Sequence, residues 1–507
     1  MTTDDKWFEN MESGIPKNGV RTRFAPSPTG YMHVGGLRTA LYAYLVAKKS
    51  GGTFILRIED TDRARFVEGA TEIIKQTLNG AGLVYDEGPD VGGPCAPYTQ
   101  SERMDTYLPY AEKLCRTGAA YYCFCESAAQ AEAEAEDKTQ DDKSHYQIKD
   151  DPCRDLDYAQ SQQKVSEGAP FVIRMKAPRD GETTVSDMVF GQVTTQNKTL
   201  DDMVLIKRDA MPTYNFANVI DDHLMGITHV LRGSEYISSA PKYNILYKSL
   251  GWEIPNYITV SPVMRDAKQK LSKRHGDPTY DDLLSQGYLP DAVLNYVALL
   301  GWSPGGEREI FTLPEMIDVF EISGISKAPA IFDTEKLKHF NSEYIRALSP
   351  ERFAAISQPY IRQTVKNEKI DAAAISQILQ ARCEKLSDIP EKVDFFDALP
   401  EYDTQIYIHK KSKTDEEISK NMLNAVRPAL EAIQNWTAEE IHDTFISLAQ
   451  KLEVKNATLM WPVRIAISGK AVTPGGAVEI CQILGKQETL SRIEKGIEKL
   501  ACCLSDN

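Results

Sequence analysis

Apolar and polar positions alternate in a regular way near the start of the chain. Residues 20–25 (VRTRFA) alternate apolar and basic side chains, which predicts a half-buried strand. Residues 37–52 (LRTALYAYLVAKKSGG) repeat apolar positions at helical spacing and end on lysines and glycines, as helices do. Residues 53–60 (TFILRIED) predict a second strand. Strand, crossover helix and strand form a parallel pair, so we expect a doubly wound, Rossmann-like α/β sheet.

Helical periodicity dominates the second half of the chain. It is clear in DAVLNYVALLGW and LPEMIDVFEI within residues 278–349, where Pro290 and Pro314 suit first-turn positions. It continues beyond residue 350, for example in FAAISQPYIRQTV and AEEIHDTFISLAQKL. We therefore expect an all-α region to follow the α/β part, which itself carries an α+β insertion.

Composition limits the class of protein. At 507 residues the chain is too long for one core, and 42% hydrophobic with 26% charged residues is typical of globular proteins. The sequence contains no run of ~18 apolar residues, so it predicts no membrane span. The opening MTTDDKWFENMESGIPKNG has no apolar leader-like run and is too acidic for a transit peptide, so we expect a cytoplasmic protein. Nine cysteines, an odd number, favour thiols or metal ligands over disulfides.

Charge is unevenly distributed along the chain. The net charge of −15 argues against a nucleic-acid partner when taken alone. However, residues 265–275 (RDAKQKLSKRH) hold five basic side chains against one acidic, whereas residues 131–142 hold six acidic against one basic. A local basic face therefore remains possible.

The loop at residues 26–36 (PSPTGYMHVGG) is longer than the ~2–6 residues usual between a strand and a helix. It lies at the carboxyl end of a predicted strand, where α/β sheets bind ligands beside helix N-termini. Its glycines allow backbone N–H groups to approach an anion, but without G-x-G-x-x-G a dinucleotide is not indicated. His33 opens the helix, where a ring nitrogen could donate to a phosphate. The alternative is that His33 only begins the helix and the prolines only stiffen the turn.

Three motifs carry a resemblance to a known family. PSPTGYMHVGG resembles the first signature of class I aminoacyl-tRNA synthetases, and its APSPTG lead-in resembles glutamyl-tRNA synthetases in particular. RIEDTDRARFVEGA at 57–70 resembles the segment after the second strand of that family, and KLSKR at 270–274 resembles the second class I signature. The resemblance covers about residues 20–500. Gly36 stands where the first signature has its second histidine, which removes one phosphate donor.

The resemblance implies that ATP and L-glutamate form glutamyl-adenylate and that the glutamyl group then passes to tRNA(Glu). Because negative charge develops on phosphate oxygens, this chemistry needs positioning and cations, with Mg²⁺ carried by ATP, and no protein nucleophile. The catalytic residues implied are His33, Lys270 and Lys273. The ATP-binding residues implied are Pro26, Thr29, Gly30, His33, Gly35, Gly36 and Lys273.

Selecting glutamate over the nearly isosteric glutamine requires a cation facing the side-chain carboxylate. Arg23 and Arg232 are the two candidates, and we favour Arg232. The resemblance implies that Glu59 pairs with the α-ammonium group. The glutamate-binding residues implied are Arg23, Ala25, Ser27, Glu59, Tyr214, Asn218 and Arg232. Asp221 and Asp222 are interpreted as caps of local structure and not as a metal pair.

A cysteine cluster in the predicted insertion forms an incomplete zinc pattern. Cys123 and Cys125 are two apart, and Cys153 follows later. The resembling family has a Cys-x-Cys and a later Cys-x-His in this insertion, and Asp155 stands at the histidine position. We expect one Zn²⁺ with Asp155 as fourth ligand, although His145 or Tyr146 could replace it and a zinc site lost with its cysteines retained stays open.

The domain boundaries follow from the motifs and the resemblance. We expect a catalytic domain at 19–100 and 207–266, an acceptor-binding insertion at 101–206, a stem-contact helical domain at 267–349 and an anticodon-binding region at 350–507. Arg427 and Arg464 are among the possible anticodon readers. We expect a monomer.

The sequence leaves four alternative functions to consider. A non-discriminating enzyme would also charge tRNA(Gln) with glutamate, which the sequence does not decide. A non-catalytic tRNA-binding relative is disfavoured because His33, Lys270, Lys273, Arg23 and Arg232 are intact. Small nucleotidylyltransferases and the shorter relatives that modify queuosine have no use for the long helical C-terminal region.

Overall fold

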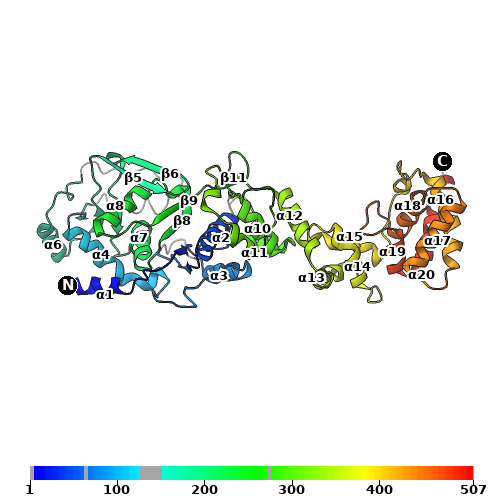
Figure 1. Ribbon diagram of the computed structural model, residues 1–507, viewed down its shortest axis with the longest axis horizontal. Helices are drawn as coiled ribbons and strands as arrows, with labels where there is room; N and C mark the ends of the chain where they lie inside the picture. Colours follow the sequence, from blue (N-terminus) through cyan, green and yellow to red (C-terminus); the bar gives the residue numbers. More distant parts are fainter. Residues whose placement is uncertain (1–4, 62–66, 126–150, 272–275, 506–507) are drawn as a thin grey trace. The chain divides into compact units, whose positions relative to one another are not determined.

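The computed structural model describes residues 5–61, 67–125, 151–271 and 276–505 (Figure 1). Contacts divide the chain into two compact units. The first consists of Met1–Asp282 with Val293–Asp333, and the second of Leu283–Ala292 with Thr334–Asn507. Lys273, His145 and Tyr146 lie outside the described residues.

The first unit is built on a six-stranded sheet in the order β2-β1-β8-β9-β5-β6. Its strands are β1 (Arg21–Phe24), β2 (Thr53–Leu56), β8 (His229–Gly233), β9 (Asn256–Val260), β5 (Glu182–Asp187) and β6 (Gly191–Gln196). β1 runs parallel to β2, with Arg23 opposite Ile55, and parallel to β8 on its other side. β8 and β9 are also parallel. The predicted parallel, doubly wound α/β sheet is therefore confirmed.

Helix α2 (Val34–Lys49) connects β1 to β2, as the apolar periodicity predicts. Its apolar side chains, such as Leu37, Leu41 and Leu45, are completely buried, and each contributes about 2 kcal/mol through burial. Gly51, just past the helix, has φ = 62°, the left-handed conformation that ends many helices. The other helices of this sheet region are α3 (Ala70–Gly80), α7 (Tyr214–Leu224) and α8 (Ala240–Leu250).

The insertion forms a small sheet of its own. Its strands β3 (Ala120–Cys123), β4 (Val172–Met175) and β7 (Val204–Ile206) pair antiparallel, beside α4 (Met104–Arg116) and α6 (Tyr158–Ser166). The structure differs from the predicted insertion at 101–206, because the hairpin β5–β6 within it joins the main sheet through β9. In β5 every second residue is buried, as expected for a strand with one solvated face.

The remaining elements of the first unit surround this framework. Helix α1 (Asp5–Ser13) packs Phe8 edge-on against Tyr110 of α4, with ring centroids 5.0 Å apart. Strands β10 (Val263–Met264) and β11 (Ala330–Ile331) form a short parallel pair. Helices α9 (Tyr280–Ser285), α10 (Pro290–Leu299) and α11 (Leu313–Val319) follow the second signature, and α9 and α10 each include residues of both units.

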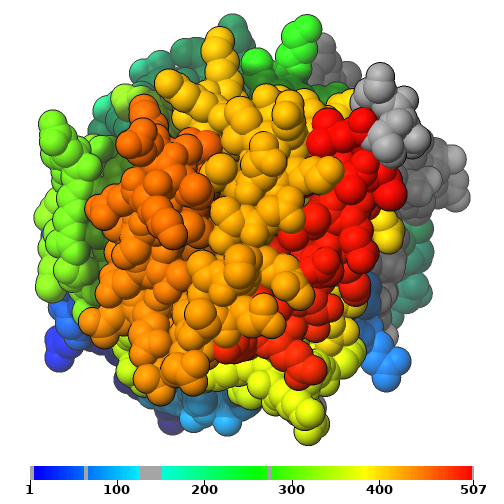
Figure 2. Space-filling view, turned by 90° about the vertical axis from the view of Figure 1, so that its right-hand side faces the viewer, coloured from blue at the N-terminus to red at the C-terminus, as the bar shows by residue number. Residues whose placement is uncertain are grey.

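The second unit is helical, in agreement with the predicted all-α region. Its helices are α12 (Thr334–Ala347), α13 (Pro350–Thr364), α14 (Ala372–Leu379), α15 (Ile389–Val393), α16 (Glu416–Glu431), α17 (Ala438–Lys451), α18 (Asn456–Ser468), α19 (Ala477–Leu484) and α20 (Lys486–Ser505). Apolar side chains from α13 to α20, including Phe353, Leu423 and Phe445, form one buried core. Figure 2 shows the orange and red segments, α16 to α20, at the surface of this unit. Over the described ranges, no helix combines the length and apolar character needed to cross a bilayer.

Candidate active site

His33 is the N-cap of α2. Its Nδ1 accepts a hydrogen bond from the Gly36 N–H at 3.1 Å, and its backbone is extended. The prediction that His33 begins the helix is thus confirmed. Because Nδ1 is an acceptor, the proton of the neutral ring lies on Nε2, and Nε2 is the nitrogen able to donate to an anion. A Cβ at Gly35 would lie 3.0 Å from His33 Cε1, so a side chain there would crowd the ring.

The loop between β1 and α2 is tied to the segment after β2. The Glu59 N–H donates to the Pro26 carbonyl at 3.1 Å, and the Thr29 N–H donates to the Ser27 carbonyl at 2.9 Å. Gly30 has φ = 113°, which a residue with a side chain rarely adopts. Ala25, Pro26 and Ser27 are half-buried and Thr29 is exposed. These bonds hold the first signature beside Glu59.

The second signature begins close to the end of β8. Lys270 Nζ lies 3.8 Å from Glu235 Oε2, two residues beyond β8, and the lysine side chain is half-exposed. After the signature, Thr279 forms a bridge with His33, and the Tyr280 N–H donates to the Met32 carbonyl at 3.3 Å. The flank of the second signature therefore contacts the first.

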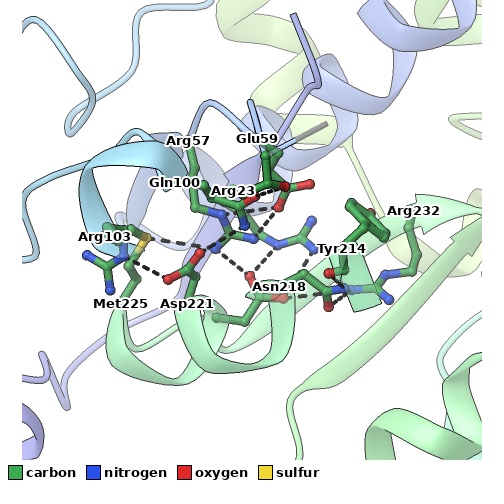
Figure 3. A network of polar contacts seen from close by, with 12 residues as sticks. Arg23, Arg57, Glu59, Gln100, Arg103, Tyr214, Asn218, Asp221, Met225 and Arg232 are labelled. Atoms are coloured by element: carbon green, nitrogen blue, oxygen red, sulfur yellow. Dashed lines mark hydrogen bonds and ion pairs between the residues drawn. The ribbon is translucent and has the colours of Figure 1, made fainter. Parts of the chain in front are cut away.

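Arg23 on β1 is held by α7. Its Nε and Nη2 donate to the two oxygens of Asp222 at 2.9 and 3.2 Å, and its Nη1 donates to the Leu231 carbonyl at 3.1 Å (Figure 3). Each of its three nitrogens thus already has a protein acceptor. Arg23 is 5% exposed, so this is a buried ion pair.

Arg57 is a site residue that the sequence reasoning missed. It is fully buried, and it donates from Nη1 to Asp222 at 2.8 Å and from Nη2 to Glu59 Oε1 at 2.8 Å. Glu59 itself is 2% exposed, and its Oε2 has no hydrogen-bond partner within the described ranges. Burial raises the pKa of Glu59, and Arg57 opposes that shift. Oε2 can therefore accept from a ligand.

Arg232 at the end of β8 keeps unused donors. Its Nη2 lies 3.5 Å from Asn218 Oδ1 and 3.7 Å from Asp222 Oδ2. Its Nε and Nη1 are buried without a hydrogen-bond partner in the part of the chain that the structure describes. Its guanidinium carbon lies over three rings, those of Tyr243 (4.8 Å), Tyr236 (5.5 Å) and Tyr257 (5.9 Å). Buried N–H groups without an acceptor are costly, so this arginine is suited to bind an anion.

Tyr214 and Asn218, both predicted to line the site, come from the same helix. The Asn218 side-chain amide donates to the Tyr214 carbonyl at 2.8 Å, one helical turn away. The Tyr214 ring lies 5.7 Å from the ring of Tyr236. Figure 3 shows both residues between Arg23 and Arg232.

Asp221 and Asp222 are not caps of local structure, so that interpretation is wrong. Both are buried on α7 and point to different partners, because successive helical residues are about 100° apart. Asp221 accepts hydrogen bonds from three side chains of the 3₁₀ turn Gln100–Arg103 and of α4. These donors are Arg103 Nε (2.7 Å), Gln100 Nε2 (2.9 Å) and Tyr107 Oη (3.0 Å). No local pattern in the sequence predicts these pairs, because the partners are more than a hundred residues apart.

Arginines dominate the electrostatics of the network, by which we mean the side chains of Arg23, Arg57, Glu59, Asp222 and Arg232. Burial would raise the pKa of Asp222, but Arg23 and Arg57 overcome it and hold the pKa at about 2. Asp222 is therefore ionised at neutral pH. The network contains three guanidinium groups but only two carboxylates, those of Glu59 and Asp222. One cation is left without a matching anion.

The cysteine cluster differs from the prediction in its fourth member. The ligand atoms of Cys123, Cys125, Asp151 and Cys153 all lie within 4.8 Å of one another. Asp155 lies outside this group, because its side chain is 92% exposed and 3.8 Å from Lys176 Nζ. Three sulfurs and one carboxylate oxygen are a donor set that fits tetrahedral Zn²⁺.

A tight turn explains why Asp151 takes the place of Asp155. The Cys153 N–H donates to Asp151 Oδ1 at 2.9 Å, and the Arg154 N–H donates to the Asp151 carbonyl at 3.0 Å. The turn folds the carboxylate toward Cys125 Sγ, at 3.6 Å from Oδ1. Burial and the neighbouring Cys153 raise the pKa of Cys125 to about 11.

The comparisons with known proteins agree with this geometry. Residues 19–339 match the family "tRNA synthetases class I (E and Q), catalytic domain", and residues 352–497 match "Anticodon binding domain". A glutamate–tRNA ligase of Clostridium botulinum is 54% identical over 483 residues, covering 95% of this chain and 99% of the relative. A glutamate–tRNA ligase of Clostridium kluyveri is 54% identical over 488 residues, covering 96% of this chain and 99% of the relative.

Solved structures give the same result. The crystal structure of a glutamate tRNA ligase from Elizabethkingia meningosepticum in complex with its amino acid has a TM-score of 0.84 and 37% identity, covering 95% of this chain and all of that one. The glutamate–tRNA synthetase of Elizabethkingia anophelis has a TM-score of 0.82 and 36% identity, with the same coverage. The chain therefore belongs to the class I tRNA synthetases, and within them to the glutamate–tRNA ligase family.

Proposed function

We propose that this protein ligates L-glutamate to tRNA(Glu) in an ATP-dependent reaction through glutamyl-adenylate. Family membership supports the reaction class, and the relatives that cover nearly the whole chain are named glutamate–tRNA ligases. The observation that carries the choice of amino acid is Arg232, whose Nε and Nη1 are buried without an acceptor among the described residues.

Arg232 binds the side-chain carboxylate of glutamate in this proposal, and Glu59 Oε2 accepts from its α-ammonium group. Arg23 is the weaker candidate for the carboxylate, because Asp222 and the Leu231 carbonyl already occupy its nitrogens. The side chains proposed to complete the pocket are those of Arg23, Ala25, Ser27, Tyr214 and Asn218.

ATP is proposed to bind between the two signatures. His33 Nε2–H and the backbone N–H groups of the Gly35–Gly36 turn would donate to phosphate oxygens, with Pro26, Thr29 and Gly30 lining the loop. Lys270 and Lys273 would supply positive charge, since negative charge grows on the phosphates as the carboxylate attacks. Mg²⁺ bound to ATP would shield the same oxygens.

Glutamate fits the charge of the pocket better than glutamine does. At neutral pH glutamate carries two carboxylates and one ammonium group, a net charge of about −1. Its binding would neutralise the surplus cation of the pocket. Glutamine is a zwitterion without net charge, and its amide would leave the Arg232 guanidinium buried and uncompensated, at a cost of several kcal/mol.

We also propose that Cys123, Cys125, Cys153 and Asp151 hold one structural Zn²⁺ in the insertion. The ion would link the Cys-x-Cys end of β3 to the turn at Asp151. Metal analysis of the purified protein tests this proposal. A content near one zinc per chain is expected, and a content near zero rejects it.

We propose that the protein acts in the cytoplasm. We also propose that it is a monomer. All nine cysteines are free thiols in the structure, which suits a reducing compartment. Sedimentation measurements at several concentrations test the monomer.

Aminoacylation with purified tRNAs tests the proposed function. Wild-type protein with ATP and glutamate is expected to charge tRNA(Glu) and to leave tRNA(Gln) uncharged. Neither the non-discriminating nor the non-catalytic alternative is favoured by the comparisons. Charging of both tRNAs would establish the first, and tRNA binding without charging would establish the second.

A further inference from the structure

Arg57 has no exposed surface. It bonds Glu59 and Asp222, and its Nη1 lies 3.8 Å from Met225 Sδ. In Figure 3 Arg57 lies on the Glu59 side of the network, away from Arg232. Arg57 would therefore act on a ligand bound by Arg232 and Glu59 Oε2 indirectly, through the two carboxylates that Arg57 itself binds.

Asp222 is shared by three arginines. Its Oδ1 accepts from Arg23 and from Arg57, whereas its Oδ2 accepts from Arg23 and lies 3.7 Å from Arg232. Without Arg57, the two remaining arginines would face the two carboxylates in equal number. The two carboxylates, Asp222 and Glu59, would then neutralise both arginines. No surplus positive charge would remain for a ligand at Arg232.

We propose that Arg57 and Asp222 are specificity-determining positioning residues, because together they fix the pocket at one surplus positive charge. That surplus acts together with the contact of Arg232 to select glutamate over glutamine. The inference rests on the proposed function and extends it to residues that lie behind the glutamate site.

The other groups around the network do not alter this balance. Asp221 and Arg103 form their own pair at 2.7 Å. Burial raises the pKa of the neighbouring tyrosines, so their phenols are neutral at physiological pH. These tyrosines are Tyr214, Tyr243, Tyr247 and Tyr257. An imbalance of charge in a site screened from water acts strongly on a ligand, because little solvent is present to compensate it.

Three variants of the full-length protein test the proposal. Arg57→Met removes the charge and keeps most of the side-chain volume, Arg57→Lys keeps the charge and loses the planar fork, and Arg57→Met combined with Asp222→Asn restores the surplus of one. The measurement is kcat/KM for glutamate and for glutamine in ATP–pyrophosphate exchange with tRNA(Glu) present, with kcat and KM separated.

The expected results follow net charge. Arg57→Met should lower the glutamate-to-glutamine ratio by roughly 100-fold or more, mainly through KM, whereas Arg57→Lys should change it by less than ~10-fold. The double variant should regain at least ~10-fold of the ratio lost by Arg57→Met. A purely structural role predicts the opposite for the double variant, since Asp222→Asn replaces a buried oxygen that accepts from arginine by an amide NH2 group that cannot accept.

Equal ratios in Arg57→Met and the wild type would overturn the proposal, and so would a double variant no more selective than Arg57→Met. If Arg57→Met does not fold, as judged by circular dichroism, the double variant is compared with Arg57→Lys. Ratios that differ by more than ~10-fold between those two would then overturn it. A wild-type protein that activates neither amino acid would instead reject the proposed function.

Discussion

The arginine network and the cysteine cluster bury polar groups in two different ways. In the network, each carboxylate contacts an arginine, and Glu59 Oε2 and two donors of Arg232 have no hydrogen-bond partner among the residues that the structure describes. In the cluster, Cys125 Sγ and Cys153 Sγ lie 3.6 Å apart, and nothing carries a compensating positive charge among its four members. We therefore expect the pocket to keep its shape without substrate, and the cluster to depend on an ion.

The largest expected effect comes from removing the two donors of Arg232, Nε and Nη1, that have no partner among the described residues. Arg232→Gln should lower kcat/KM for glutamate by roughly 1000-fold and remove the preference over glutamine, because the surplus charge is lost. Pyrophosphate exchange with tRNA present measures both. Arg23→Gln is the matched comparison, because it removes the same charge but leaves the unpaired donors of Arg232 in place, so its loss of kcat/KM for glutamate should be smaller. A larger loss than in Arg232→Gln would exchange the roles of the two arginines.

Asp221→Asn should separate stability from selectivity. It leaves Arg103 buried without its ion partner, so the free energy of unfolding should fall by about 3 kcal/mol. The glutamate-to-glutamine ratio should stay close to that of the wild type, because the hydrogen bonds of Asp221 go to Gln100, Arg103 and Tyr107. Urea unfolding and exchange kinetics on one sample test both parts. A collapse of the ratio with unchanged stability would contradict this division of roles on α7.

The network should also give the protein a defined acid sensitivity. The pKa of Asp222 is depressed to about 2 in the folded protein from an ordinary value of 3.8. A depressed pKa stabilises the fold above the ordinary value, so about 2 kcal/mol should be lost as pH falls from ~4 to ~2. Unfolding free energies across this range, compared with those of Asp222→Asn, isolate the contribution. Identical slopes for the two proteins would assign the loss to other carboxylates.

The smallest effect concerns the fourth member of the cluster. Asp151→Asn should weaken zinc binding by roughly 10-fold or more, as seen in competition with a chelator. Asp155→Asn is the matched control, and it should bind zinc as the wild type does, because Asp155 is exposed and apart from the thiols. The reverse pattern would restore Asp155 as the ligand.

The local framework of the fold could be predicted from the sequence. The spacing of apolar residues and the residues at the element ends, all of them local, predict β1, α2 and β2. The place of His33 just before the apolar repeat predicts it as the start of α2. The resemblance supplied the residues of the pocket wall. Whether those residues act as proposed depends on the kinetic tests above.

The partnerships behind the pocket could not be predicted. Arg57 and Asp222 are 165 residues apart, and only the arrangement of β2 and α7 around β1 and β8 brings them together. Asp151 was missed because Cys-x-Asp spacing pointed to Asp155, whereas a turn decides which carboxylate faces the sulfurs. β5 and β6 were assigned to the insertion because their sequence order does not reveal that β9 is their neighbour.

The adjacent carboxylates of α7 also constrain how this helix can change in evolution. A single residue inserted before Asp221 would rotate the following side chains by about 100°, so Asp221 would take the place of Asp222 and Asp222 would turn away from the arginines. Loops elsewhere in the chain can lengthen at little cost, but the length of α7 up to Asp222 has to be inherited unchanged.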